Sequence, residues 1–100
     1  MSSDSVFLVY CELSGESPPL REEGFAGAFV TCLVLTEDIS DAIQEARQIL
    51  REDGYVIVDI DKALRFEPHE WTHDEDISTL ADQVAKSAES AYSNFDVWGH

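Results

Sequence analysis

The hydrophobic pattern of residues 29–61 constrains the fold more than any other feature of this chain. Apolar side chains alternate with period two along residues 27–35, recur at helical spacing along residues 39–50, and alternate again along residues 55–61. This succession is typical of a strand, a helix and a second strand. A unit of this size normally closes as a right-handed crossover between parallel strands. The pattern therefore predicts a domain that combines helices with a sheet.

The helix of this unit has the most consistent local signals. Thr36 or Asp38 can cap its first turn, and Gly54 suits a left-handed cap at its end. Arg47 and Arg51 lie toward the C-terminus, where positive charge is favourable. Apolar side chains fall on one face, which predicts packing against a sheet. This face consists of Ile39, Ala42, Ile43, Ala46, Ile49 and Leu50.

The rest of the chain predicts one strand before this unit and one helix after it. Residues 6–13 form an apolar and aromatic run of strand length. Residues 14–24 are rich in glycine, proline and charge, which predicts a long mobile loop. An apolar stripe along residues 77–91 predicts a second amphipathic helix. The alternating tail of residues 94–98 can add a short edge strand.

These elements predict a single α+β domain over residues 1–100. One hundred residues support one core and not two. The expected order is strand, strand, helix, strand, helix, with three to four strands and both helices on one face of the sheet. This is a two-layer α/β sandwich, and ferredoxin-like is the nearest common architecture. Residues 1–5 and 99–100 are expected to be frayed.

The composition predicts a folded protein of the cytoplasm. Hydrophobic residues make up 44% of the chain and charged residues 27%, values close to those of globular proteins. The first residues do not resemble a signal peptide, and no apolar run is long enough to span a membrane. Cys11 and Cys32 follow no metal or redox spacing, so both are expected to be reduced and buried in apolar strands.

The net charge of −15 comes from 21 acidic residues and six basic ones. Because phosphate binding requires clustered lysine or arginine, this charge argues against nucleic acid and against an anionic membrane surface as partners. It is consistent with a protein partner that has a basic surface, or with a metal cation. The simpler interpretation is an acidic protein whose molecules repel one another in solution.

The segment from His69 to His73 matches a zinc-binding pattern. In that pattern two histidines one helical turn apart bind zinc, and the glutamate between them, here Glu70, acts as general base. The two imidazoles meet at one ion only if they lie on one helix. A proline directly precedes the motif, and the second helix is expected to begin only near Asp74. The simpler interpretation is a polar loop in which Trp71 packs against the core.

Carboxylates gather at the downstream end of the third predicted strand. Asp59, Asp61 and Glu67 lie there, with Trp71 nearby. Ligands of open α/β sheets tend to bind at that end of the strands. Clustered carboxylates can hold a hard cation or exchange protons, although strand ends are also solvated and tolerate charge. The sequence therefore marks this edge as a candidate for binding a ligand or a partner.

The sequence favours a small acidic binding module that docks a basic protein partner, or an oligomeric regulatory domain. The alternative is a metal-binding domain or a small zinc-dependent hydrolase that uses the histidine motif with zinc or another divalent cation. No nucleophile or phosphate-binding glycine loop accompanies the carboxylates, so an enzyme is less favoured and no cofactor is expected.

A sheet face with Phe29, Leu33 and Leu35 would be too apolar to leave in water, which predicts a homodimer.

Overall fold

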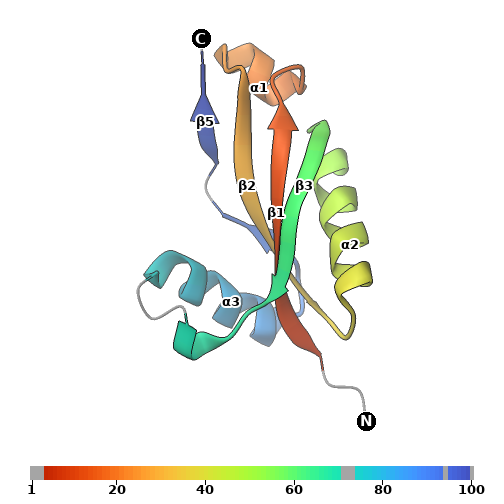
Figure 1. Cartoon of the computed structure of the whole chain (residues 1–100), viewed down its shortest axis with the longest axis vertical. Coiled ribbons are helices and arrows are strands. Elements are labelled where there is room, and N and C mark those ends of the chain that lie inside the picture. The colour runs from red at the N-terminus through yellow and green to blue at the C-terminus, as the bar shows by residue number, and fades with distance from the viewer. Residues whose placement is uncertain (1–3, 71–73, 94, 100) are drawn as a thin grey trace.

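The computed structural model describes residues 4–70, 74–93 and 95–99 of the chain. The structure is α+β, with five strands and three α-helices among these residues, and no described helix has both the length and the apolar character needed to cross a bilayer. The elements follow the order β1 (Ser5–Ser14), α1 (Pro18–Glu23), β2 (Gly27–Thr36), α2 (Ile39–Glu52), β3 (Ile57–Arg65), the 3-10 turn η1 (Pro68–Glu70), α3 (Glu75–Ser87), β4 (Ala91–Tyr92) and β5 (Asp96–Trp98) (Figure 1).

One antiparallel sheet joins the five strands. The order is β3-β1-β2-β4, and β5 also pairs with β2. β2 and β3 both run antiparallel to β1, so they run parallel to each other with β1 between them. The predicted strand, helix and second strand are therefore present with parallel strand directions. The connection from β2 through α2 to β3 crosses β1, so the two parallel strands are not neighbours in the sheet.

α2 covers one face of the sheet. It begins after Asp38, one of the two predicted caps, whose carboxylate accepts a hydrogen bond from the Ser40 N–H at 3.2 Å. The apolar side of the helix packs against alternate residues of β1 and β2. This core cluster contains Phe7, Val9, Cys11, Leu13, Leu20, Ala28, Val30, Cys32, Val34, Ala42, Ala46 and Leu50.

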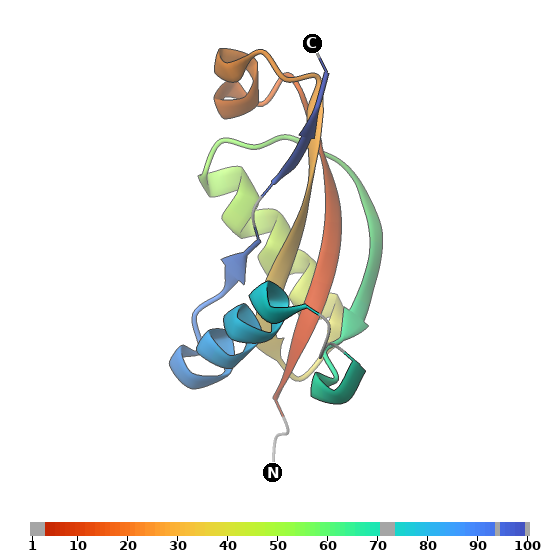
Figure 2. The same ribbon diagram turned by 90° about the vertical axis from the view of Figure 1, so that its left-hand side faces the viewer.

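α3 packs on the opposite face, near the end of the sheet where β1 begins (Figure 1 and Figure 2). Its buried residues Ile77, Ala81 and Val84 belong to a second cluster that includes Leu8 and Leu33. The structure therefore differs from the prediction of both helices on one face, and the ferredoxin-like order is not confirmed. The physical reason is that residues 6–9 of β1 are all buried. A strand with apolar side chains on both faces needs cover on both.

A short helix, α1, lies in the segment that the sequence predicted to be a mobile loop. Pro18 occupies the start of the helix, where the missing N–H has no helical partner to lose, and Gly24 ends it at φ 81°. Leu20 is buried in the α2-side cluster. Ser17 is fully buried, and its hydroxyl accepts a hydrogen bond from the Val56 N–H at 2.7 Å. The composition concealed this helix because proline can begin a helix as well as end one.

Replacing Ser17 by alanine is expected to lower the free energy of unfolding by about 1–2 kcal/mol, because the Val56 N–H would lose its partner at a part-buried site. Urea denaturation followed by circular dichroism measures the change. Ser40→Ala, at the exposed start of α2, is the control, with an expected change below about 0.5 kcal/mol. Equal effects of the two substitutions would mean that the Ser17 hydroxyl does not fasten α1 to the chain before β3.

β3 forms one edge of the sheet, and its register with β1 shifts twice. The shifts lie between Tyr10 and Cys11 and between Glu12 and Leu13. At these shifts β3 contains residues without a direct partner on β1, which are Asp61 and Val58 respectively. Each is a β-bulge, which bends the strand and increases its local twist.

Candidate functional site

The candidate site lies on the part of the sheet that α3 leaves uncovered. α3 covers its face of the sheet at Leu8 and Leu33, and the half near α1 and β5 has no described helix over it (Figure 1 and Figure 2). Directly paired residues of antiparallel strands point to the same face, so the strand register arranges the side chains in rows. We call this region the open sheet face, and it consists of Tyr10, Glu12, Phe29, Thr31, Asp59, Lys62, Asp96 and Trp98.

The row nearest α3 contains Lys62, Tyr10 and Thr31 on β3, β1 and β2. The Lys62 ammonium lies over the Tyr10 ring, 4.9 Å from its centroid, a distance at which the ring attracts a cation. Burial, and then the negative charge of Asp74, raises the pKa of Tyr10. The Tyr10 hydroxyl therefore stays protonated at neutral pH and can donate a hydrogen bond.

The next row combines an aromatic ring with carboxylates. Phe29 on β2 pairs with Glu12 on β1 and with Asp96 on β5, and Glu12 pairs on its other side with Asp59 on β3. Like charges directly opposite each other destabilise a sheet. The ion pairs that the structure gives for residues 4–70, 74–93 and 95–99 all lie elsewhere. This row therefore holds three carboxylates that have no cationic partner in the described part of the chain.

Phe29 and Trp98 form an exposed aromatic pair beside these carboxylates. Their ring centroids are 4.8 Å apart with the planes tilted by 38°. The indole lies against Gly27, where an added Cβ would overlap Cζ2 of Trp98, so only glycine leaves room for the ring. Phe29 is 48% exposed and Trp98 is 38% exposed. Adjacent large apolar side chains on a solvated surface are typical of a docking site.

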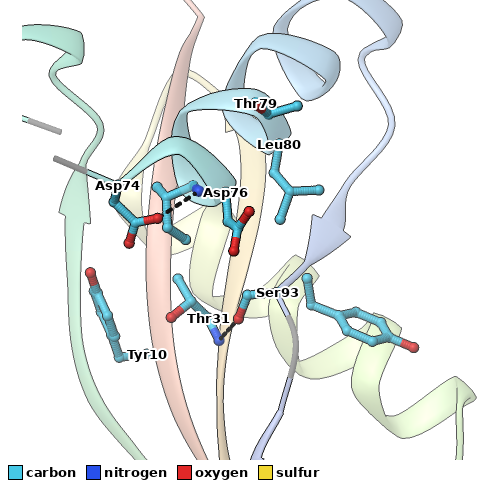
Figure 3. Close-up of a pocket in the computed structure, with 9 residues that line it drawn as sticks. Tyr10, Thr31, Asp74, Asp76, Thr79, Leu80 and Ser93 are labelled. Carbon is cyan, nitrogen blue, oxygen red and sulfur yellow. Dashed lines mark hydrogen bonds between the residues drawn. The ribbon is translucent and has the colours of Figure 1, made fainter. Parts of the chain in front are cut away.

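Two adjoining hollows lie along the open sheet face. The first, of about 560 Å³, lies at the start of α3, where Asp74 and Asp76 face Tyr10 and Thr31 (Figure 3). The second, of about 390 Å³, shares Tyr10 and Thr31 with the first and extends past Phe29. Carboxylates border the combined depression from α3 to β5, and they belong to Asp61, Asp74, Asp76 and Asp96.

The acidic residues at the start of α3 have a structural explanation. Asp74 caps the helix, since its Oδ1 accepts a hydrogen bond from the Ile77 N–H at 3.1 Å (Figure 3). Glu75 and Asp76 lie in the first turn, where negative charge complements the helix dipole. The case for a binding site therefore depends on the row of Phe29, Glu12 and Asp96, whose carboxylates cap no helix.

Tyr92 and Ser93, at the end of β4, form hydrogen bonds with β2 and with the residue that follows α2. The Thr31 N–H donates to Oγ of Ser93 at 3.1 Å (Figure 3), and the Ser93 N–H donates to the Thr31 carbonyl at 2.8 Å. The Tyr92 hydroxyl donates to Oδ2 of Asp53 at 2.5 Å, just beyond the end of α2. This hydrogen bond, followed by burial, raises the pKa of Tyr92 to about 12. These contacts fix the end of β4 against β2 and against the end of α2.

The structure separates the residues of the predicted acidic edge. β3 continues to Arg65, so Asp59 and Asp61 lie within the strand and not at its downstream end. Asp59 belongs to the open sheet face, and Asp61 lines the second hollow. Glu67 lies beyond the strand, where its Oε1 is 3.7 Å from Nε of Arg65. Trp71 lies outside the described residues.

The zinc motif lies partly outside the described residues, because His73 is not among them. His69 and Glu70 belong to η1, are exposed, and have Nε2 and Oε1 4.0 Å apart. η1 is a short 3-10 turn and not the α-helix on which the two histidines of the motif would share a face. Within the described ranges, no three His, Cys, Asp or Glu side chains are placed to hold a metal ion. Metal binding by this motif stays a prediction that the metal content of the purified protein can check.

The two cysteines are free and buried, as predicted. Both belong to the α2-side cluster, away from the open sheet face. The contact between the two thiols, together with burial, raises the pKa of Cys32. A thiolate is therefore disfavoured at Cys32, and the position gives no support to a nucleophilic role.

The sequence interpretation named Asp59 and Phe29 and missed the other six residues of the open sheet face, which are Tyr10, Glu12, Thr31, Lys62, Asp96 and Trp98. The available signals were weak: Glu12 interrupts an otherwise apolar strand, and alternation along the tail places Asp96 and Trp98 on the same side. Glu12, Asp96 and Trp98 come together because β1 and β5 both pair with β2.

No protein-family model, curated protein or solved structure matches the chain.

Proposed function

We propose that the chain is a small binding module that docks a basic protein partner through the open sheet face. The main supporting observation is the position of exposed Phe29 between the carboxylates of Glu12 and Asp96. Exposed aromatic side chains supply contact area at the centre of an interface, and charges around them select a partner of opposite sign. A basic protein would bury the ring and neutralise the carboxylates at the same time.

The charge of the whole chain supports the same class of partner. A net charge of −15 attracts a basic surface over long range and accelerates the encounter. The carboxylates of the open sheet face would repel the phosphates of a nucleic acid or of an anionic lipid. A basic protein is therefore the class of macromolecule that fits both the local and the overall charge.

The same face fits a second copy of the chain less well. The predicted homodimer depended on Phe29, Leu33 and Leu35 forming one exposed apolar surface. Leu33 is buried beneath α3, and Leu35 is partly buried in the same cluster. A second copy would also bring its own carboxylates against Glu12 and Asp59. We therefore favour a basic partner over self-association through this face.

A titration followed by amide chemical shifts tests the proposal. The probe is a synthetic peptide that alternates lysine with serine, and binding is expected to shift the amides of Glu12, Phe29 and Asp96. Because the contact is electrostatic, the shifts should shrink as the ionic strength rises. The same peptide with glutamate in place of lysine is the control and should cause no shifts. Absence of binding at low salt, or shifts centred on the exposed side of α2, would contradict the proposal.

A further inference from the structure

We infer that the partner places an arginine, in preference to a lysine, over the Phe29–Trp98 pair and between the carboxylates of Glu12 and Asp96. This inference rests on the proposed docking of a basic protein, and it adds the side chain that the face selects. It follows from the geometry of one row of the sheet, from the position of the nearest internal cation and from the shape of the two basic side chains.

The row places an aromatic ring between two acceptors. Phe29 is directly paired with Glu12 on one side and with Asp96 on the other, and directly paired side chains have Cβ atoms about 4.5–5.5 Å apart. A flat group stacked on the Phe29 ring therefore lies within reach of both carboxylates. Trp98 enlarges the aromatic surface, with its ring centroid 4.8 Å from that of Phe29.

The nearest internal cation on this face is already engaged one row away. The Lys62 ammonium lies over the Tyr10 ring, 4.9 Å from its centroid, so one aromatic ring of this face already has a cation against it. Among the described residues, neither Phe29 nor Trp98 has a cation over its ring. The partner is therefore the source of the charge that this second aromatic position would bind.

The arrangement favours a guanidinium over an ammonium. A guanidinium is planar and weakly hydrated, so it can stack on a ring while the N–H groups at its edge donate to carboxylates in the same plane. An ammonium is a compact and strongly hydrated charge, and it cannot form paired hydrogen bonds to a carboxylate in a fixed plane. Glu12 and Asp96, on either side of Phe29, suit the first geometry.

The unpaired carboxylates give the inference a distinctive signature. Glu12 and Asp59 are cross-strand partners of like charge, which destabilises the free protein. A bound guanidinium would offset this repulsion. Replacing Glu12 by glutamine should therefore weaken binding while leaving the melting temperature unchanged or higher. If Glu12 had a purely structural role, its replacement would lower both the binding affinity and the melting temperature.

Isothermal titration with two peptides, one alternating arginine with serine and one alternating lysine with serine, tests the preference. The arginine peptide is expected to bind about tenfold more tightly, because only its side chain gains both stacking and paired hydrogen bonds. Equal affinities would overturn the inference and leave the proposed function intact. If neither peptide bound, both would fall together.

Two variants locate the preference on this row. Glu12→Gln should weaken binding of the arginine peptide about fivefold to tenfold and binding of the lysine peptide about twofold. Phe29→Leu, which keeps an apolar contact without a ring, should make the affinities of the two peptides equal. Glu45→Gln, on the exposed side of α2, is the matched control and should change neither affinity. Equal losses for both peptides in Glu12→Gln, or a preserved preference in Phe29→Leu, would overturn the inference.

Discussion

Replacing Leu8 by alanine is expected to lower the free energy of unfolding by about 3–4 kcal/mol, one of the largest effects available to a single substitution in this chain. Leu8 is fully buried on central strand β1, in the cluster beneath α3. The substitution would remove buried methyl groups and leave a cavity that the two flanking strands and the helix can close only in part. Urea denaturation measures the change.

This substitution also tests the placement of the helices on opposite faces. If α2 and α3 shared a face, Leu8 would lie on a solvated surface and its loss would cost little. Val58→Ala, at a position that is 58% exposed on edge strand β3, is the control, with an expected change below about 1 kcal/mol. Similar values for the two substitutions would contradict the burial of the second face by α3.

Replacing Gly27 by alanine is expected to lower the free energy of unfolding by about 2–3 kcal/mol and to weaken binding of the arginine peptide about tenfold or more. The new Cβ would overlap Cζ2 of Trp98, so the indole would have to leave its position. Displacement of Trp98 would break the ring contact with Phe29 and disturb the pairing of β5 with β2. Urea denaturation and peptide titration measure the two effects.

A double-mutant cycle separates steric displacement from an intrinsic need for glycine. In a Trp98→Ala background the added methyl group has no indole to meet, so Gly27→Ala should cost less than about 0.5 kcal/mol there. The coupling energy between positions 27 and 98 would then account for most of the loss in the free energy of unfolding. A cost of the same size in both backgrounds would mean that the backbone at Gly27, and not the contact with Trp98, requires glycine.

Local sequence signals were sufficient to predict an element when all of the evidence for it lies within its own segment. The apolar stripe and the capping residue of α2 lie within one segment, and the structure confirms both the helix and the Asp38 cap. α1 was missed because its evidence is tertiary: Leu20 enters the core, and the Ser17 hydroxyl bonds a backbone N–H that lies far along the chain. Composition alone cannot distinguish such a segment from a loop.

The placement of α3 and the location of the site depend on strand order, which periodicity does not specify. The apolar run along residues 6–13 predicted a strand, yet it did not indicate which helix covers which face of that strand. Asp59 was found as a candidate because it lies near other acids in sequence. Glu12 and Asp96 come from distant segments and meet only through β2.

The two bulges of β3 have a consequence for behaviour at high concentration. In the described part of the chain β3 pairs on one side only, and a regular edge strand offers a row of unpaired N–H and C=O groups to any other extended chain. The unmatched residues Val58 and Asp61 interrupt that row at two places, and Asp59 adds a charge between them. Polymerisation through edge-to-edge strand addition is thereby discouraged at this side of the sheet.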